Sequence, residues 1–252
     1  MNIISRFFIA LSVFIILPLQ ANSVSVTVQP IVGDAWQWQQ PQAVRWQQLL
    51  AALQAKGVDA RWAQLSLPAE HPKTAALEVE RARLLKDLHQ LGQYWARNGK
   101  HGLLRSATEL SAQIKNLPLV ARLPVNFNYD QVRINANDNP LLTEHYQLAI
   151  HPRPTFVWAQ GLVRLPGKRP FVDSAFAYDY GRRLNMLPGA EHNQVWIIQP
   201  DGHVMPSPID PFAPEFVGVA PGATLFVGFK SLPRAFADIN QRIMTLFANR
   251  EL

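Results

Sequence analysis

The chain has 252 residues, a formal net charge of +6 and no cysteine. Because it has no cysteine, its fold cannot be held by disulfides and must bury an ordinary hydrophobic core, and thiolate zinc sites and cysteine nucleophiles are excluded. A chain of this length can bury such a core as one or two domains.

The first 21 residues have the three parts of a secretory signal. Arg6 gives a basic start, residues 7–17 form an apolar run, and Ala21 or Ser23 provides a small-residue exit. The run is shorter than the roughly 20 apolar residues of a membrane-spanning helix. We therefore predict cleavage of the signal and an exported protein without a membrane span. Losing Arg6 lowers the net charge from +6 to +5. Export argues against nucleic acid as a partner, whereas an envelope rich in anionic polysaccharide suits a basic surface.

The segment after the signal predicts a domain of mixed α and β structure. Residues 24–30 alternate valine with polar side chains, which is the period of a strand with one buried face. A helix is predicted from Pro41 to Gly57, and residues 58–67 predict a second strand. The glutamine-rich stretch 34–42 is interpreted as a loop.

Two further helices together predict an αα-hairpin over residues 74–116. Thr74 is a candidate N-cap, and residues 98–102 (NGKHG) separate the two helices. Apolar side chains recur at helical spacing on both helices: Leu77, Leu84, Leu88, Leu91 and Trp95 on the first, and Leu103, Ala107, Leu110 and Ile114 on the second. This pattern is typical of core packing and not of a cofactor site.

Beyond the hairpin, the sequence predicts the remaining strands of a first domain over residues 22–152. Residues 119–127, 129–140 and 146–154 are interpreted as β structure, in which proline and Asn/Asp clusters separate the strands. The PRP sequence at 152–154 is the predicted boundary between two domains.

The second domain is predicted over residues 153–232. A Pro-Gly turn at 166–167 and an Asp-Gly turn at 201–202 indicate two hairpins. A short helix lies between them, and residues 221–229 predict a closing strand. This ββαβββ order is the one expected of a β-grasp domain.

The last segment, 233–252, predicts an amphipathic helix that packs on the second domain. Its apolar residues lie on one side of the helix: Phe236, Ile239, Ile243, Leu246 and Phe247. Packing is expected because an apolar stripe of this size rarely stays exposed.

Four segments of the second half carry a resemblance to a known family. They are VWAQGLVRLPG at 157–167, LPGA at 187–190, VWIIQPDG at 195–202 and APGATLFVG at 220–228. In this order they resemble the soluble-ligand-binding β-grasp (SLBB) repeat of outer-membrane polysaccharide export proteins. Residues 22–252 as a whole resemble the GfcC-like family of capsule and exopolysaccharide biosynthesis proteins.

The resemblance implies an α+β fold of two β-grasp domains, which are ubiquitin-like or SLBB-like, with the helical hairpin inserted in the first. It also implies periplasmic residence and a role in assembling or exporting surface polysaccharide. The implied partners are the polysaccharide export machinery or an acidic surface polysaccharide. Members of the family are usually not assigned a catalysed reaction, and this chain lacks the membrane-spanning helix and lipidation cysteine of the transport protein itself.

The sequence supports no catalytic, cofactor or metal site. The seven histidines include no H-x-x-x-H pair. Glycosidase chemistry needs two carboxylates, but Asp201 is explained by its turn and Asp173 by the start of a helix. The other carboxylates of the second domain, Asp179, Asp210 and Glu215, form no independently supported pair.

Three residues are candidates for ligand binding. Arg122 opens a strand beside apolar neighbours and matches an arginine position of the GfcC-like pattern. Its guanidinium can hold a uronate or phosphate by two hydrogen bonds, or it can be a structural arginine that bonds backbone carbonyls. Trp36 and Trp38, in the predicted loop, are candidates for contact with glycan or a partner, whereas Trp158 and Trp196 are expected in the core.

The first functional hypothesis is a periplasmic accessory protein of capsule or exopolysaccharide assembly and export that acts by binding protein or glycan. The alternative from another class is a polysaccharide-modifying enzyme with an arginine-lined pocket. A third interpretation is an envelope scaffold without glycan contact. The lack of a supported nucleophile or acid–base pair favours the first hypothesis over the second.

Overall fold

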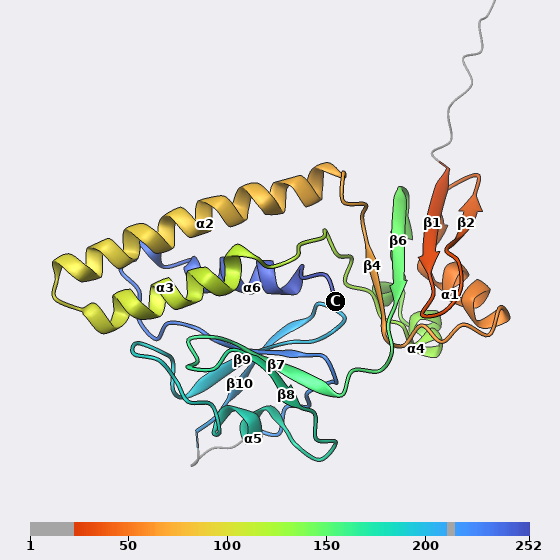
Figure 1. Cartoon of the computed structure of the whole chain (residues 1–252). Helices are drawn as coiled ribbons and strands as arrows, with labels where there is room; N and C mark the ends of the chain where they lie inside the picture. Colours follow the sequence, from red (N-terminus) through yellow and green to blue (C-terminus); the bar gives the residue numbers. More distant parts are fainter. Residues whose placement is uncertain (1–22, 211–214) are drawn as a thin grey trace, which may run out of the picture.

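Two sheets and a long helical hairpin make up the mixed α+β fold (Figure 1). The structure is a computed structural model that describes residues 23–210 and 215–252. The predicted signal at 1–21 lies outside these residues. Within the described ranges, no helix has the length and apolar character needed to cross a bilayer.

The first sheet has four strands in the order β2-β1-β6-β4. Its central strands β1 and β6 are parallel, and both outer strands are antiparallel to their neighbours. The valines of the predicted first strand are fully buried at alternate positions, and helix α1 shares their core. The elements are β1 (Val24–Gln29), β2 (Trp36–Gln40), α1 (Trp46–Ala55), β4 (Ala63–Ser66) and β6 (His145–Ile150), with a small separate pair of β3 (Val44–Arg45) and β5 (Leu141–Leu142).

The second sheet has five strands in the order β10-β9-β11-β7-β8. It repeats the arrangement of the first: a hairpin, a parallel pair made by the first and last strands (β7 and β11), and an antiparallel strand beside the last. In each half, a helix separates the opening hairpin from the strand that follows. The elements are β7 (Phe156–Gly161), β8 (Gly167–Pro170), α5 (Ala177–Gly181), β9 (Gln194–Ile198), β10 (Val204–Pro208) and β11 (Thr224–Val227).

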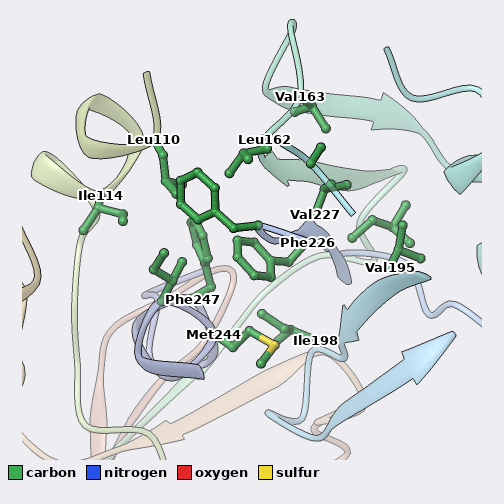
Figure 2. Packing of buried hydrophobic residues seen from close by; sticks show 14 of the residues in the cluster. Leu110, Ile114, Leu162, Val163, Val195, Ile198, Phe226, Val227, Met244 and Phe247 are labelled. Atoms are coloured by element: carbon green, nitrogen blue, oxygen red, sulfur yellow. The ribbon is translucent and has the colours of Figure 1, made fainter. Parts of the chain in front are cut away.

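The helical hairpin is inserted in the sequence between β4 and β6 of the first sheet, but it packs on the second sheet. It consists of α2 (Pro72–Arg97) and α3 (His101–Lys115), close to the predicted range. Figure 2 shows Leu110 of α3 gathered with Phe226 of the second sheet and Phe247 of the C-terminal helix. The Gln113 side chain also forms two hydrogen bonds with the backbone of Gly161, at 2.8 and 2.9 Å.

The C-terminal helix α6 (Ile239–Ala248), which follows a short 3-10 turn η2 (Arg234–Phe236), lies between the hairpin and the second sheet (Figure 1). It buries most of the predicted apolar stripe, and only Phe236 is half-buried. Its polar side is joined to α2 by Arg242, whose guanidinium lies 2.5 Å from a Glu80 oxygen and 2.7 Å from an Asp87 oxygen. The helix is therefore held by both apolar and ionic contacts.

Residues 129–138 form helical turns, so the strand predicted over 129–140 is wrong. Helix α4 spans Tyr129–Ile134, and a 3-10 turn, η1, spans Ala136–Asp138. The Asn128 side chain accepts hydrogen bonds from two backbone N–H groups of the first turn of α4, and Asn135 caps η1 in the same way. These caps favour helical turns, although the proline and asparagine residues of this segment had indicated loops between strands.

Candidate functional site

A cavity of about 520 Å³ lies where the chain passes from the first sheet to the second. The connection from Ile150 at the end of β6 to Phe156 at the start of β7 forms one wall, and the residues after α6 form another. The chain ends close to this junction (Figure 1). We call this space the arginine cavity, and the residues that define it are Trp62, His151, Arg153, Trp158, Lys168 and Arg250.

Arg250 is the central cation of the arginine cavity. Its backbone bridges to Leu119 and accepts a hydrogen bond from the Gln64 side chain at 3.2 Å, which fixes it beside the first sheet. The residue is only 6% exposed, and its guanidinium carbon lies 4.3 Å from the centroid of the Trp158 ring. Burial and, secondly, the positive charge of Arg122 lower the pKa of Arg250 to about 10. Its guanidinium has no ion pair or hydrogen bond within the described part of the chain.

Two further cations lie over aromatic rings at the edge of the cavity. Lys168 pairs with Trp158 across the hairpin of β7 and β8, and its ammonium lies 5.3 Å from that ring and 4.1 Å from the Phe156 ring. The Arg153 guanidinium lies 6.0 Å from the Trp62 ring but also forms an ion pair with Asp173 at 2.9 Å. Because an aromatic face attracts a cation without neutralising it, these rings position positive charge while keeping it available.

His151 contributes a neutral polar group to the same cavity. Burial, together with the positive charge of Arg122, lowers the pKa of His151, although Glu251 opposes the shift. Its imidazole is therefore uncharged at neutral pH. The Nε2 atom is fully buried and has no hydrogen-bond partner among residues 23–210 and 215–252.

Arg122 lies behind the cavity and connects three parts of the fold. Its backbone bridges to Ser66 of β4, and its guanidinium donates hydrogen bonds to the carbonyl of Ala248 at 3.2 Å and to the carbonyl of Pro200. Burial lowers the pKa of Arg122 to about 10, and the charge of Asp201 opposes this effect. Its contacts are those of a structural arginine that bonds backbone carbonyls. A role in ligand binding stays a prediction.

Trp36 and Trp38 lie on a strand at the far edge of the first sheet. The predicted loop is β2, in which tryptophan and glutamine alternate with the period of a strand, and both tryptophans are half-buried. Lys56 lies over Trp36, 4.8 Å from its ring centroid. Arg122 neighbours β4 at the opposite edge, so four strand spacings, or about 19 Å, separate it from the tryptophans. The three predicted binding residues are therefore not brought together.

A second cavity of about 660 Å³ adjoins the first and shares Trp62, Ala63 and Pro200 with it. Several of its polar side chains already have partners. Gln199 bonds the backbone of the segment before β11, and Asp201 pairs with His203 at 3.2 Å. Within the residues that the structure describes, no group of three or more His, Cys, Asp or Glu side chains is placed to hold a metal.

The sequence reasoning missed Arg250, Lys168 and the cavity face of Trp158. Along β7, Val157 and Ala159 are buried, whereas Phe156 and Trp158 are half-buried on the other face. The alternation of this strand is visible in the sequence, but a large apolar side chain such as Trp158 predicts the core face. Arg250 follows the end of a helix, where a basic residue is common and carries no special signal.

Comparisons with known proteins agree with the resemblance seen in the sequence. The family model described as capsule biosynthesis GfcC, N-terminal, matches residues 21–153, and the model described as capsule biosynthesis GfcC C-terminal matches residues 165–251. A similar protein of Escherichia coli strain K12, named "Uncharacterized protein YjbG", is 29% identical over 154 residues. That match covers 60% of this chain and 63% of the relative, which is less than two thirds of the relative's length. Because the N-terminal model alone covers more than half of the chain, the protein belongs to the GfcC family of capsule biosynthesis proteins.

Proposed function

We propose that the protein is a periplasmic accessory factor of capsule or exopolysaccharide assembly and export that binds anionic glycan without cleaving it. Membership of the GfcC family supports the link to capsule biosynthesis. The export machinery is the proposed setting, and the glycan is the proposed ligand.

We also propose that both halves of the molecule are β-grasp domains. In each half an opening hairpin is followed by a helix, and the last strand inserts parallel to the first at the centre of the sheet. The order of the other strands agrees between the two sheets, apart from the added strand β10. This repetition supports a duplicated binding-type domain, and the SLBB-like assignment rests on it.

The observation that carries the functional proposal is the arginine cavity. Its volume falls within the range of about 300–1,000 Å³ typical of small-molecule sites. Aromatic rings and cations line it together, and two of its three cations have no carboxylate partner within the described ranges. This combination suits a ligand that has both a ring skeleton and negative charge.

Titration with polysaccharides tests the proposal. The protein without its first 21 residues should bind polygalacturonate, a uronate polymer, and should not bind neutral dextran. Raising the salt from about 0.1 to 1 M shortens the screening length from about 10 to 3 Å and should weaken binding roughly tenfold or more. Calorimetry measures the affinity, and a reducing-end assay runs in parallel. Equal affinity for dextran would contradict the proposed ligand, and reducing ends that rise with time would favour the polysaccharide-modifying enzyme.

Fractionation of cells tests the proposed location. The protein should be released by osmotic shock and should begin at Asn22 or Val24, because the apolar run ends at a small-residue exit. N-terminal sequencing of the released protein gives the cleavage point. A protein that stays with the spheroplasts and retains Met1 would show that the leader is not processed.

A further inference from the structure

Among the residues that the structure describes, Arg250 is a buried cation without a counter-ion, in contrast to Arg242 of the preceding helix. Arg242, two turns earlier, is surrounded by three carboxylates, those of Glu80, Asp87 and Asp238. Arg250 is more deeply buried, but no carboxylate pairs with it in the part of the chain that the structure describes. Burying an unpaired charge is unfavourable for folding, so its presence at a cavity wall calls for a partner from outside the chain.

The way in which Arg250 is held leaves its hydrogen-bond donors available. The guanidinium carbon lies 4.3 Å from the centroid of the Trp158 ring, and an aromatic ring attracts a cation without supplying an oxygen acceptor for its N–H groups. The edge carries five N–H donors in a rigid fork that matches the two oxygens of a carboxylate. No N–H of the fork is engaged by an acceptor among residues 23–210 and 215–252.

The surroundings of Arg250 favour an anion over a neutral ligand. The Lys168 ammonium lies 5.3 Å from the same Trp158 ring, and Arg122 adds positive charge from behind. Glu251 is the acidic side chain that lines the cavity, but it is exposed and forms no ion pair with Arg250 in the described structure.

We propose that the arginine cavity binds the carboxylate of a single uronate residue through the two-pronged edge of Arg250, with the sugar ring filling the remaining space. This inference rests on the proposed function, since it names the part of an anionic glycan that the protein recognises. A phosphate substituent has similar oxygens, so the experiment includes phosphate as a separate probe.

Binding of small probes to three forms of the protein tests the site. D-Galacturonate, D-galactose and inorganic phosphate are titrated into wild type, Arg250→Met and the control Arg133→Met, with binding followed by NMR. Methionine keeps an unbranched apolar chain against Trp158 but removes the charge. Arg133 is exposed on α4, so its substitution makes the same change in net charge away from the cavity.

Wild type and Arg133→Met should bind galacturonate with equal affinity and bind galactose much more weakly. Arg250→Met should lose roughly thirtyfold or more of the galacturonate affinity, because a buried charge pair loses one partner. Arg250→Lys should also bind several-fold more weakly, since an ammonium lacks the planar fork. Unchanged galacturonate binding in Arg250→Met would overturn the proposal, as would equal binding of galactose. Phosphate that binds more tightly than galacturonate, with the same dependence on Arg250, would replace the uronate with a phosphorylated ligand.

A thermal melt without ligand shows whether loss of binding is a folding defect. Arg250→Met should melt at the same temperature as wild type or higher, because an unpaired buried charge has been removed. If this variant does not fold, Arg250→Lys carries the binding test by itself.

The outcomes also separate this site from the broader function. If Arg250→Met still binds polygalacturonate as wild type does, the proposed uronate site is wrong, but the proposed glycan-binding function is retained. Wild type that binds galacturonate through Arg250 but ignores the polymer overturns the function and leaves the site standing.

Discussion

Phe247→Ala is expected to lower the free energy of unfolding by about 3–5 kcal/mol, the usual loss for a large aromatic side chain in a core. Phe247 is 2% exposed, and its ring lies 5.8 Å from that of Phe226 at the centre of the second sheet. Figure 2 shows that Leu110 of the hairpin belongs to the same cluster. The substitution therefore opens a cavity at a point where three elements meet.

Urea unfolding measured by circular dichroism gives the size of this effect. Thr245→Ala is the matched control, because Thr245 is exposed on the same helix, and its change should stay within about 0.5 kcal/mol. Since native domains are stable by only about 5–15 kcal/mol, the Phe247 variant should unfold at a much lower urea concentration. Equal midpoints for Phe247→Ala and Thr245→Ala would show that α6 does not contribute to the core of the second sheet. Arg250 follows α6 directly, so a detached helix would also remove the central cation of the arginine cavity.

Arg122→Ala is expected to lower the free energy of unfolding by about 2–3 kcal/mol, because hydrogen bonds to a charged donor contribute about 1.5–3 kcal/mol each. The substitution leaves the carbonyls of Ala248 and Pro200 without their donor. Part of the loss is offset because a buried charge is removed as well. Arg122→Lys should lose less stability, because its ammonium retains the charge and can reach one of the two carbonyls.

The same variants decide between the two roles considered for Arg122. If the residue is structural, Arg122→Ala should unfold at lower urea concentration, and its folded form should bind polygalacturonate as wild type does. Arg133→Ala is the control for the change in net charge. An unchanged unfolding midpoint combined with lost polymer binding would instead make Arg122 a ligand-binding arginine, as its place in the sequence predicted.

Much of the fold was predictable because it depends on neighbours along the chain. The α+β class followed from strands with a period of two, such as the buried valines of β1, and from helices with a period of 3.6, such as the leucine stripe of α2. The turn at 201–202 was readable because Asp-Gly favours a tight turn. The connection between β7 and β8 instead spans residues 162–166, and Gly167 of the predicted Pro-Gly turn is the first residue of β8. The strand predicted over 129–140 failed because asparagine side chains bond the local backbone, and these caps stabilise helical turns.

The candidate site depended on contacts between distant residues, which local patterns do not encode. The alternation of β7 separated Val157 from Trp158, but only the packing of the two sheets shows which face meets a cavity. In the same way, the apolar stripe of the hairpin predicted that the hairpin packs against another element, and only the tertiary structure identified that element as the second sheet. Arg250 reaches Trp158 because α6 is docked by burial of its apolar side, a non-directional force that any complementary surface can satisfy. The sequence by itself thus determined most of the helices and strands and the family. Only the tertiary structure showed that Arg250 is buried and that no carboxylate among the described residues pairs with it.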